Sequence, residues 1–520
     1  MSQLMPDLTN IQPFEADYSQ RIDSDTLDPV VINDSGGSQG GGFCRFTLNN
    51  KGFLSHDSRI VLGLLDNGNG ADVAFLAPHI GVKQLIHSCV LKIGAKVVSE
   101  IRDFASLSAY ESLFSSPAEN LDRNQYINGQ IYNVSQVNDY TQLDPTIGQK
   151  RASTLSLNNG MCLLTSNITD KTADANNPLP NNQKGGDIQS IRPQQSSQAN
   201  SLFSLRLSEL FPFFASDKQF PLVLMDEQIN IEIHFNAYPF NCCRGTKGET
   251  AASLAREFKV NTKEVKLMAD YVFFDAETMA QYIAENKNKE FRWNYLDYRL
   301  SQQVIPAEGG DGTISKNIRN IGGAGLIVNK VIMGLEDTST MEPDGGAGAD
   351  DDVKAVAKYW LSTLNLLNRF KGVRTLSSDV SKSRFAWNVR YNDRYLYPID
   401  RENDSLLMND IYLAENKPFR VCKDHYSKQS KTTRESNWIN VMNVEHNMLE
   451  GQLFWTTAKL DGRRINMNGI DIEFLNTSVD DNDYNNAKFD SKTKVFTQNV
   501  FLEIERYAVL KDGIVDCYYE

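Results

Sequence analysis

Residues 207–236 read LSELFPFFASDKQFPLVLMDEQINIEIHFN, and the end of this stretch alternates strictly between apolar and polar positions. Ile229, Ile231 and Ile233 share one side of the pattern, and polar residues occupy the positions between them. Because successive side chains of a β-strand point to opposite faces, this spacing predicts a strand with one face in a core and the other nearer water. Half-buried strands of this kind are typical of antiparallel β-sandwiches.

The same alternation recurs along the chain. It is strictest at 203–207 and 265–273, where every second residue is apolar. A period of two over such lengths indicates strands rather than helices. Further strands are expected at 85–101, 326–335, 465–474 and 495–510. The chain is therefore predicted to be mainly β.

Helices and loops are expected to fill the intervals between these strands. Short helices, with apolar residues at three- and four-residue steps, are predicted at 103–114, 275–283 and 353–369. Surface loops are predicted for the long polar stretches at 115–200, 337–352 and 398–437, with one strand near 161–164. Residues 287–300 are expected to connect into a new strand.

The composition is that of an ordinary globular protein, with 41% hydrophobic and 23% charged residues. Aromatic residues make up 10% of the chain and include 26 Phe and 20 Tyr, which favours strands. A length of 520 residues allows about three average domains or two large β-domains. The formal net charge of -13 argues against a protein that coats the phosphate backbone of a nucleic acid.

A faint repeat favours the second of these divisions. Residues 228–236 read QINIEIHFN, and residues 468–476, 240 positions later, read NGIDIEFLN. About 40 residues after each segment comes a similar tail, DYVFFD at 270–275 and RYAVLKD at 506–512. Alternating strands resemble one another by chance, but two matches in the same order favour a tandem duplication. The boundary between the two copies would fall near residue 285.

The first 42 residues differ from the rest in composition. Residues 1–34 contain seven acids and one base, and residues 35–42 read SGGSQGGG, which is typical of a flexible hinge. We therefore expect an extended acidic arm and hinge at 1–42, a first domain at 43–285 and a second at 286–520. We expect no secretory signal, because no basic segment followed by an apolar one opens the chain, and no membrane-spanning stretch.

No motif points to catalysis, a cofactor or a metal. The chain contains neither GxxxxGK[ST] nor HExxH, and its seven cysteines form no CxxC pair, which favours reduced and mostly buried thiols. His87 and Cys89 would share one face of a strand, but two ligands fall short of a zinc site. The acids at 480–483 are expected to form a solvated turn rather than a calcium loop. Many carboxylate pairs are available for acid–base chemistry, and the sequence singles out none.

The stretch at 207–236 resembles a segment of the double jelly-roll major capsid proteins. These proteins occur in nucleocytoplasmic large DNA viruses, virophages and polinton-like viruses. The resemblance lies in a proline–aromatic cluster at 211–214, a Pro-Leu pair that opens the next strand, and the alternating isoleucines. The residues that carry it, together with a later segment, are Pro212, Phe213, Phe214, Pro221, Leu222, Ile229, Ile231, Ile233, Asp270, Tyr271 and Asp275.

Two further segments match the family in the same order. LKIGAKVVSEI, within 85–101, is similar to an early strand pair around an Ile-Gly, and LMADYVFFDAETMAQYI, at 267–283, to the last strand of the first jelly roll. Phe274 stands where the family usually has leucine, and Glu277-Thr278 replaces the usual acid–arginine pair. These departures place the chain nearer the polinton-like and virophage branches. The match is good over 44–284 and loose in the second half.

The resemblance implies an all-β chain of two tandem jelly rolls, a pseudo-hexagonal homotrimeric capsomer and an icosahedral shell around double-stranded DNA. It implies no catalysis and no cofactor. The implied partners are further copies of the chain, penton proteins and minor or cement proteins, without specific nucleic acid binding or direct membrane contact. The implied location is the virion, with assembly in the host cytoplasm or nucleus. Residues 115–200 would then form outward-facing towers, and the acidic arm would reach a neighbouring capsomer or a minor protein.

Two other functions are consistent with parts of the sequence. A β-sandwich carbohydrate-binding protein or glycoside-active enzyme would use the aromatic residues as sugar platforms and the acids as catalysts. This alternative does not account for the ordered family segments. A minor capsid or penton protein would need only one jelly roll, which the repeat argues against.

Overall fold

The computed structural model describes fifteen separate stretches of the chain. They are 21–33, 42–66, 73–75, 80–111, 127–128, 163–164, 201–215, 219–236, 243–245, 258–305, 314–337, 385–401, 404–415, 453–477 and 496–520. The predicted helix at 353–369 and the acidic turn at 480–483 lie outside them, as do almost all of the predicted loop at 115–200 and most of those at 337–352 and 398–437. In the described stretches no helix is long and apolar enough to span a membrane.

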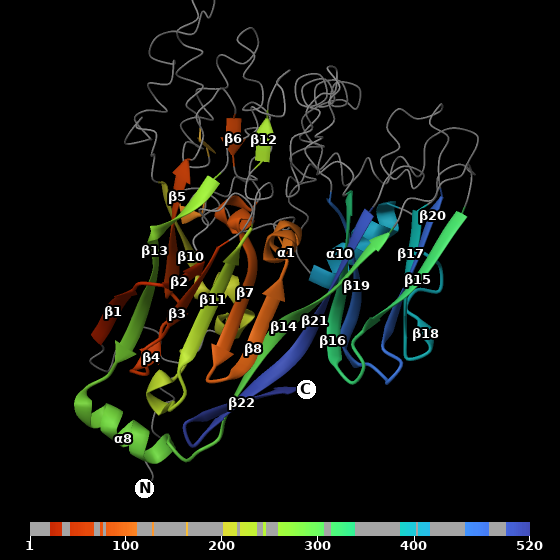
Figure 1. Cartoon of the computed structure of the whole chain (residues 1–520). Helices are drawn as coiled ribbons and strands as arrows, with labels where there is room; N and C mark the ends of the chain where they lie inside the picture. Colours follow the sequence, from red (N-terminus) through yellow and green to blue (C-terminus); the bar gives the residue numbers. More distant parts are fainter. Residues whose placement is uncertain are drawn as a thin grey trace, which may run out of the picture.

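The first half of the chain forms a sandwich of two antiparallel sheets (Figure 1). One sheet has the order β1 (Arg21–Leu27), β13 (Phe258–Phe273), β5 (Arg59–Asp66), β10 (Ser201–Arg206), with β4 (Phe53–Leu54) also paired to β13. The other has the order β2 (Val30–Asn33), β3 (Phe43–Thr47), β11 (Ile229–Phe235), β7 (Ile86–Ile93), β8 (Lys96–Arg102). A small third sheet joins β12 (Cys243–Gly245), β6 (Val73–Phe75) and β9 (Leu163–Leu164).

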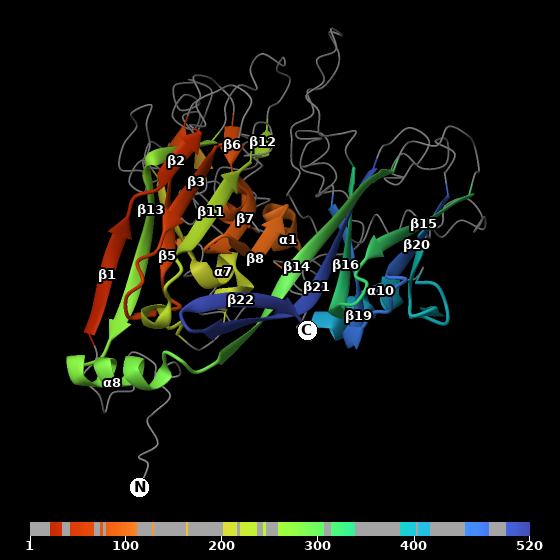
Figure 2. The same ribbon diagram turned by 60° about the horizontal axis from the view of Figure 1, so that its bottom comes forward.

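The second half forms another antiparallel sandwich beside the first (Figure 2). One sheet has the order β14 (Phe291–Ile305), β21 (Phe496–Lys511), β16 (Ile327–Asp337), β19 (Leu453–Arg464), and β22 (Ile514–Tyr519) pairs with β21. The other has the order β15 (Ile314–Gly322), β20 (Ile470–Thr477), β17 (Phe385–Tyr391), β18 (Arg394–Tyr395). The predicted connector at 287–300 is therefore mostly the long strand β14.

The two sandwiches have the same strand order. Each of the strands β14 to β21 has a counterpart at the same sheet position in the first sandwich. In chain order, these counterparts are β1, β3, β5, β7, β8, β10, β11 and β13. Eight strands in two facing sheets, with the chain passing between the sheets in this order, form a jelly roll. The predicted fold class, all-β with two tandem jelly rolls, is confirmed. We call the two sandwiches the first and second jelly rolls.

The sequence echoes fall on equivalent strands. The repeated segments at 228–236 and 468–476 form β11 and β20, each in the middle of its sheet. A further echo lies in β5 and β16, where VLGLLD at 61–66 corresponds to IMGLED at 332–337. The glycine pairs with an asparagine in both rolls, Gly63 with Asn261 and Gly334 with Asn499. The two glycines lie 271 positions apart, which does not fit the 240-residue spacing of the other echo.

Among the described residues, four short α-helices accompany the strands. They are α1 (Phe104–Glu111), α7 (Leu207–Leu210), α8 (Ala276–Asn286) and α10 (Asp404–Glu415). The first and third confirm the predicted helices at 103–114 and 275–283. Asp275 starts α8 because its Oδ1 accepts a hydrogen bond from the Thr278 amide at 2.9 Å. The prediction that loop dominates 398–437 was wrong for α10, whose apolar residues at 407 and 411 are at helical spacing.

Part of the predicted acidic arm belongs to the first jelly roll. Arg21–Leu27 pairs with β13 over seven residues, and Val30–Asn33 pairs with β3. The prediction of an extended arm was therefore wrong for these residues. An acidic segment can form this strand because β1 lies at the edge of its sheet. Its acids stay near water while its backbone pairs with β13. Residues 1–20 lie outside the described ranges.

Candidate functional site at the junction of the two jelly rolls

The proline–aromatic cluster at 211–214 connects the two jelly rolls. Pro212 opens the 3₁₀ turn Pro212–Phe214, where its missing N–H costs nothing. The buried ring of Phe213 lies with its centroid 5.0 Å from that of Tyr295 and 6.0 Å from that of Trp293, both in β14. The indole Nε1 of Trp293 donates a hydrogen bond to the Phe213 carbonyl at 2.9 Å. Residues predicted from the family resemblance thus contact a strand about 80 positions away.

The neighbouring Pro-Leu segment supports the same contact. Phe220 lies 5.1 Å from Trp293, ring to ring, and exchanges backbone hydrogen bonds with Leu54. Pro221 precedes the 3₁₀ turn Leu222–Leu224, and the Leu222 side chain is fully buried. This segment holds Phe220 between the core of the first jelly roll and β14.

The alternating isoleucines lie in the core of the first jelly roll and away from the junction. Ile229, Ile231 and Ile233 of β11 are fully buried. Ile233 is flanked in the sheet by Cys44 of β3 and Cys89 of β7, both buried free thiols. Burial raises the pKa of the Cys44 thiol to about 12, which makes it a poor nucleophile. These residues belong to the packed scaffold of the first jelly roll.

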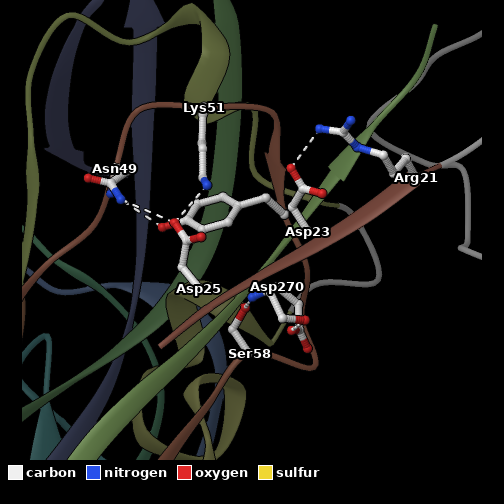
Figure 3. Close-up of polar contacts among 9 residues, drawn as sticks. Arg21, Asp23, Asp25, Asn49, Lys51, Ser58 and Asp270 are labelled. Carbon is white, nitrogen blue, oxygen red and sulfur yellow. Dashed lines mark hydrogen bonds and ion pairs between the residues drawn. The ribbon is translucent and has the colours of Figure 1, made fainter. Parts of the chain in front are cut away.

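The remaining predicted residues lie in β13 or just after it, and Asp270 lies beside β1 (Figure 3). Asp270 Oδ1 accepts a hydrogen bond from Ser24 Oγ of β1 at 2.5 Å, and its backbone N–H donates to Ser58 Oγ at 3.0 Å. The buried Tyr271 has its ring under Lys51 Nζ, 4.7 Å from the centroid. Together with the Asp275 cap of α8, these residues fasten the edge strand β1 and the end of β13.

A buried polar cluster lies at the centre of the junction, where β8 meets β14 (Figure 1). Arg506 Nη1 of β21 lies 2.7 Å from Asp297 Oδ2 of β14, and both side chains are almost fully buried. The other contacts of this pair reach the first jelly roll. Ser99 Oγ donates to Asp297 Oδ1 at 2.7 Å, and Arg506 Nη1 also donates to the Val98 carbonyl at 2.6 Å. The cluster therefore fixes one jelly roll against the other.

The protein environment of this pair is unfavourable to isolated charges. Burial raises the pKa of Asp297 above its ordinary value, although the hydrogen bonds from Arg506 and Ser99 act in the opposite direction. Burial alone would lower the pKa of Arg506, but Tyr295 and Asp297 outweigh it and raise that pKa. Each group therefore compensates the charge of the other in the interior.

A second buried cluster joins α1 to the second jelly roll. The Tyr110 hydroxyl of α1 donates to Glu415 Oε1 of α10 at 2.7 Å, and its ring lies 5.5 Å from that of Trp455. Lys330 Nζ lies 2.6 Å from Glu415 Oε1 and 3.0 Å from Glu503 Oε2. Burial acts to lower the pKa of Lys330, but Glu503 and Glu415 outweigh it and raise that pKa. The buried ammonium group of Lys330 thus forms ion pairs with two carboxylates.

The C-terminal strand extends the junction. The hairpin between β21 and β22 reaches the first jelly roll, where the Gly513 carbonyl accepts a hydrogen bond from the Asp226 amide at 2.9 Å. The Val515 amide donates to Glu227 Oε2 at 2.9 Å. Lys96 Nζ of β8 then lies 2.7 Å from Asp516 Oδ1 of β22. Figure 2 shows β22 leaving the second jelly roll and crossing beneath the first.

The hydrophobic core is shared across the junction. One cluster of buried residues contains most of the described core of the first jelly roll and also residues from β14, β16, β19, β21, β22 and α10. These contributions are Tyr295, Ile332, Ile411, Trp455, Phe501, Ala508, Leu510 and Val515. The centre of the second jelly roll forms its own cluster. The two sandwiches therefore behave as one packed body.

The junction residues of the second jelly roll were missed by the sequence analysis. Trp293, Tyr295 and Asp297 occupy every second position of β14 and therefore share one face of the strand. This was a usable signal, because an acid beside aromatic residues on a buried face needs a partner for its charge. The partner, Arg506, lies 209 positions later and could not be inferred. No group of three or more metal-binding side chains gathers among the described residues.

Comparisons with known proteins agree with this architecture. VP54 of the virus PBCV-1, fitted into a reconstruction of the virophage Sputnik, aligns over 98% of this chain and 99% of its own, with a TM-score of 0.53. A chain of the Sputnik virophage structure aligns over 100% of this chain and 92% of its own, with a TM-score of 0.50. A chain of the PBCV-1 capsid gives the same score over 98% of this chain. Sequence identity is 10% in each case.

Sequence comparison adds nothing to this likeness. No protein-family model matches the chain, and no curated protein matches it. At 10% identity, the shared feature is the order and packing of the strands along the full length of both chains. The chain has the double jelly-roll fold of these virus capsid proteins.

Proposed function

We propose that this chain is the major capsid protein of an icosahedral double-stranded DNA virus. One observation carries the proposal. Two jelly rolls with the same strand order are fixed to each other through a shared core, and the chain aligns from end to end with capsid proteins of the same fold. A rigid pair of similar sandwiches is a building block for a shell, and no step of this role needs catalysis.

The capsomer that we propose is a homotrimer. Three chains place six similar jelly rolls around a threefold axis, so the trimer approximates a hexagon and can tile a closed surface. Repeated contacts between trimers would then enclose the genome. The formal net charge of -13 is consistent with a shell that surrounds DNA without coating it.

The wider setting belongs to the same proposal. The protein would reside in the virion after assembly in the host cytoplasm or nucleus, with penton and minor or cement proteins as further partners. We keep the polinton-like or virophage-like branch as the expected origin, and residue 285 as the boundary between the two domains. The sheets are consistent with this boundary, because strands up to β13 pair only with one another and strands from β14 onward do the same.

The test is to purify the chain and to measure its mass and its assembly. We expect a stable particle of about three times 58.5 kDa, and pseudo-hexagonal tiles or shells in negative-stain images. A monomer that never associates would contradict the proposal. A glycan array and a glycoside hydrolysis assay complete the test, because binding or turnover there would favour the carbohydrate alternative, which no observation on the described residues supports.

A further inference from the structure

Strand β22 is bound by both jelly rolls, at the end of the molecule where α8 also lies (Figure 2). Its backbone pairs with β21 of the second jelly roll along all six of its residues. The first jelly roll binds the backbone of Val515, whose N–H donates to Glu227 Oε2 and whose carbonyl accepts from Lys96 Nζ, both at 2.9 Å. We call residues 513–520 the β22 strap.

The strap also supplies part of the buried core. Val515 is 1% exposed and belongs to the cluster that contains most of the described core of the first jelly roll. Its neighbour Ile514, which points to the opposite face of the strand, is 48% exposed. The first jelly roll therefore buries one face of a strand that belongs to a sheet of the second.

The turn that precedes β22 fits closely against the first jelly roll. Gly513 has a φ of +80°, its carbonyl accepts from the Asp226 amide at 2.9 Å, and a Cβ atom there would collide with the Asp226 side chain. A Cβ atom at Gly94, in the turn between β7 and β8, would lie 2.7 Å from Glu227 Oε1. Two glycine turns, one from each jelly roll, thus close on the adjacent residues Asp226 and Glu227.

The strap covers the buried ion pair of the junction as well. The Arg506 guanidinium lies 4.6 Å from the centroid of the Tyr519 ring and 5.7 Å from that of Tyr295. Tyr519 is 54% exposed, so its ring forms the outer layer over the guanidinium. Detachment of the strap would admit water to Arg506 and to its partner Asp297.

The order of these segments along the chain gives the strap a consequence for folding. Domains generally fold as units, and the N-terminal one folds first during synthesis. The described strands of the first jelly roll end at Phe273, whereas β22 begins at Ile514 and needs β21 as its partner in the sheet. The first jelly roll can therefore complete its packing around Val515 only after the second has folded.

We propose that docking of the β22 strap controls assembly, because the first jelly roll becomes rigid only when the folded second jelly roll delivers β22. A chain without a docked strap would then stay out of the shell. The inference rests on the proposed function and adds to it a control over which chains take part. Chains that are incomplete or misfolded in the second jelly roll would be rejected by this control.

The test compares two adjacent residues of the strap in the full chain. Val515→Asn places an amide without a partner against the core of the first jelly roll, which should detach the strap. Ile514→Asn, on the exposed face, is the matched control. Val389→Asn alters a fully buried residue in the separate core of the second jelly roll and controls for a general loss of stability.

Hydrogen exchange of the purified chain measures whether the strap closes the first jelly roll. We expect Val515→Asn to speed amide exchange in β8 and at residues 225–228 by about tenfold or more, with β20 unchanged, because only this end of the molecule opens. Ile514→Asn and Val389→Asn should leave β8 as in the wild type. Unchanged exchange in β8 for Val515→Asn, or the same increase for Val389→Asn, would overturn the inference.

Co-expression of each variant with the wild type measures the control over assembly. Mass spectrometry gives the ratio of the two chains in purified particles and in the folded, soluble pool. We expect Val515→Asn to be about tenfold rarer in particles than in the pool, and Ile514→Asn to enter particles in proportion. Entry of Val515→Asn in proportion, or equal depletion of both strap variants, would overturn the inference while the proposed function stands.

The two measurements keep the inference separate from the proposed function. A wild-type chain that forms no particles would contradict the proposed function, and with it any control over assembly. The exchange measurement would still decide whether the strap closes the first jelly roll, because it needs only the purified chain.

Discussion

Asp297 Oδ2 of β14 lies 2.7 Å from Arg506 Nη1 of β21, and both groups also bind the first jelly roll. An ion pair inside one sandwich thus forms half of the contact with the other. Replacing such a pair with apolar groups can be harmless, but removal of one partner leaves a buried charge without compensation. The pair therefore matters more for how the two jelly rolls are held together than for the stability of either.

The first prediction concerns this pair. Asp297→Asn should lower the free energy of unfolding by about 3–5 kcal/mol, because Arg506 stays buried and loses its carboxylate. Chemical denaturation followed by tryptophan fluorescence measures the change. Glu100→Gln is the matched control, since Glu100 pairs with Arg102 at the same 2.7 Å but at the surface, where the effect should stay below about 1 kcal/mol. Equal effects of the two substitutions would contradict the assigned role.

The second prediction concerns Lys330 and its two carboxylates. Lys330→Met should cost about 3–5 kcal/mol at neutral pH, because Glu415 and Glu503 would remain buried without a cation. The pKa of Lys330 is raised in the folded state, so its contribution is fully present below its ordinary pKa of 10.5 and is lost as the pH rises through the folded value. Denaturation of wild type and variant at several pH values measures this difference.

The control for that experiment is Lys459→Met. Lys459 pairs with Asp461 at 3.0 Å, but both side chains are about half exposed or more. We expect a change below about 1 kcal/mol at neutral pH. A Lys330→Met penalty that persists undiminished at a pH where Lys330 has lost its proton would show that lost packing, and not the charge, is responsible.

The third prediction concerns Gly334, which the repeat pairs with Gly63. A Cβ atom at Gly334 would lie 2.5 Å from the Trp455 ring, which is fully buried. Gly334→Ala should therefore destabilise the protein by about 1–3 kcal/mol through overpacking. Trp455→Phe removes the crowding atoms, so it should cost less in the Gly334→Ala background than in the wild type. Strictly additive effects in this double-mutant cycle would exclude the steric explanation.

The fourth prediction concerns the attachment of β1 at low pH. The hydrogen bond from Lys51 lowers the pKa of Asp25 below its ordinary value of 3.8. Burial acts in the opposite direction, and the hydrogen bond from Asn49 adds to the lowering. A lowered pKa means that the stabilisation is present above pH 3.8 and is lost as the pH falls through the folded value. Hydrogen-exchange protection of the β1 amides should fall in that range.

Asp25→Asn provides the comparison for this titration. The amide does not ionise, so β1 in this variant should be less protected at neutral pH and should show a smaller acid response. Parallel acid profiles of the wild type and the variant would assign the response to other carboxylates.

Elements whose signals are local could be predicted from the sequence. The alternation of Ile229, Ile231 and Ile233 follows directly from burial of one face of β11, and the Asp275 cap marks the start of α8. Edge strand β1 was missed because acids at Asp23 and Asp25 make an edge strand look like a polar arm. Contacts that join distant segments leave no local pattern.

The candidate site was predicted only in part, for the same reason. Phe213 was singled out by resemblance, but its partner Trp293 lies 80 residues away in a different sandwich. The repeat was recognised from β11 and β20, which lie 240 positions apart, whereas Gly63 and Gly334 lie 271 positions apart and do not fit that spacing. The pairing of each glycine with an asparagine of the neighbouring strand establishes their equivalence.

The core shared by the two jelly rolls has a mechanical consequence. Packed protein interiors are hard to compress and transmit strain, so a subunit with one continuous core has no soft plane between its halves. Under pressure from tightly packed DNA, the proposed capsomer would act as a stiff plate. Bending would then concentrate at the seams between chains. The contacts between chains would therefore set the curvature of the shell, and they would be the first to break under load.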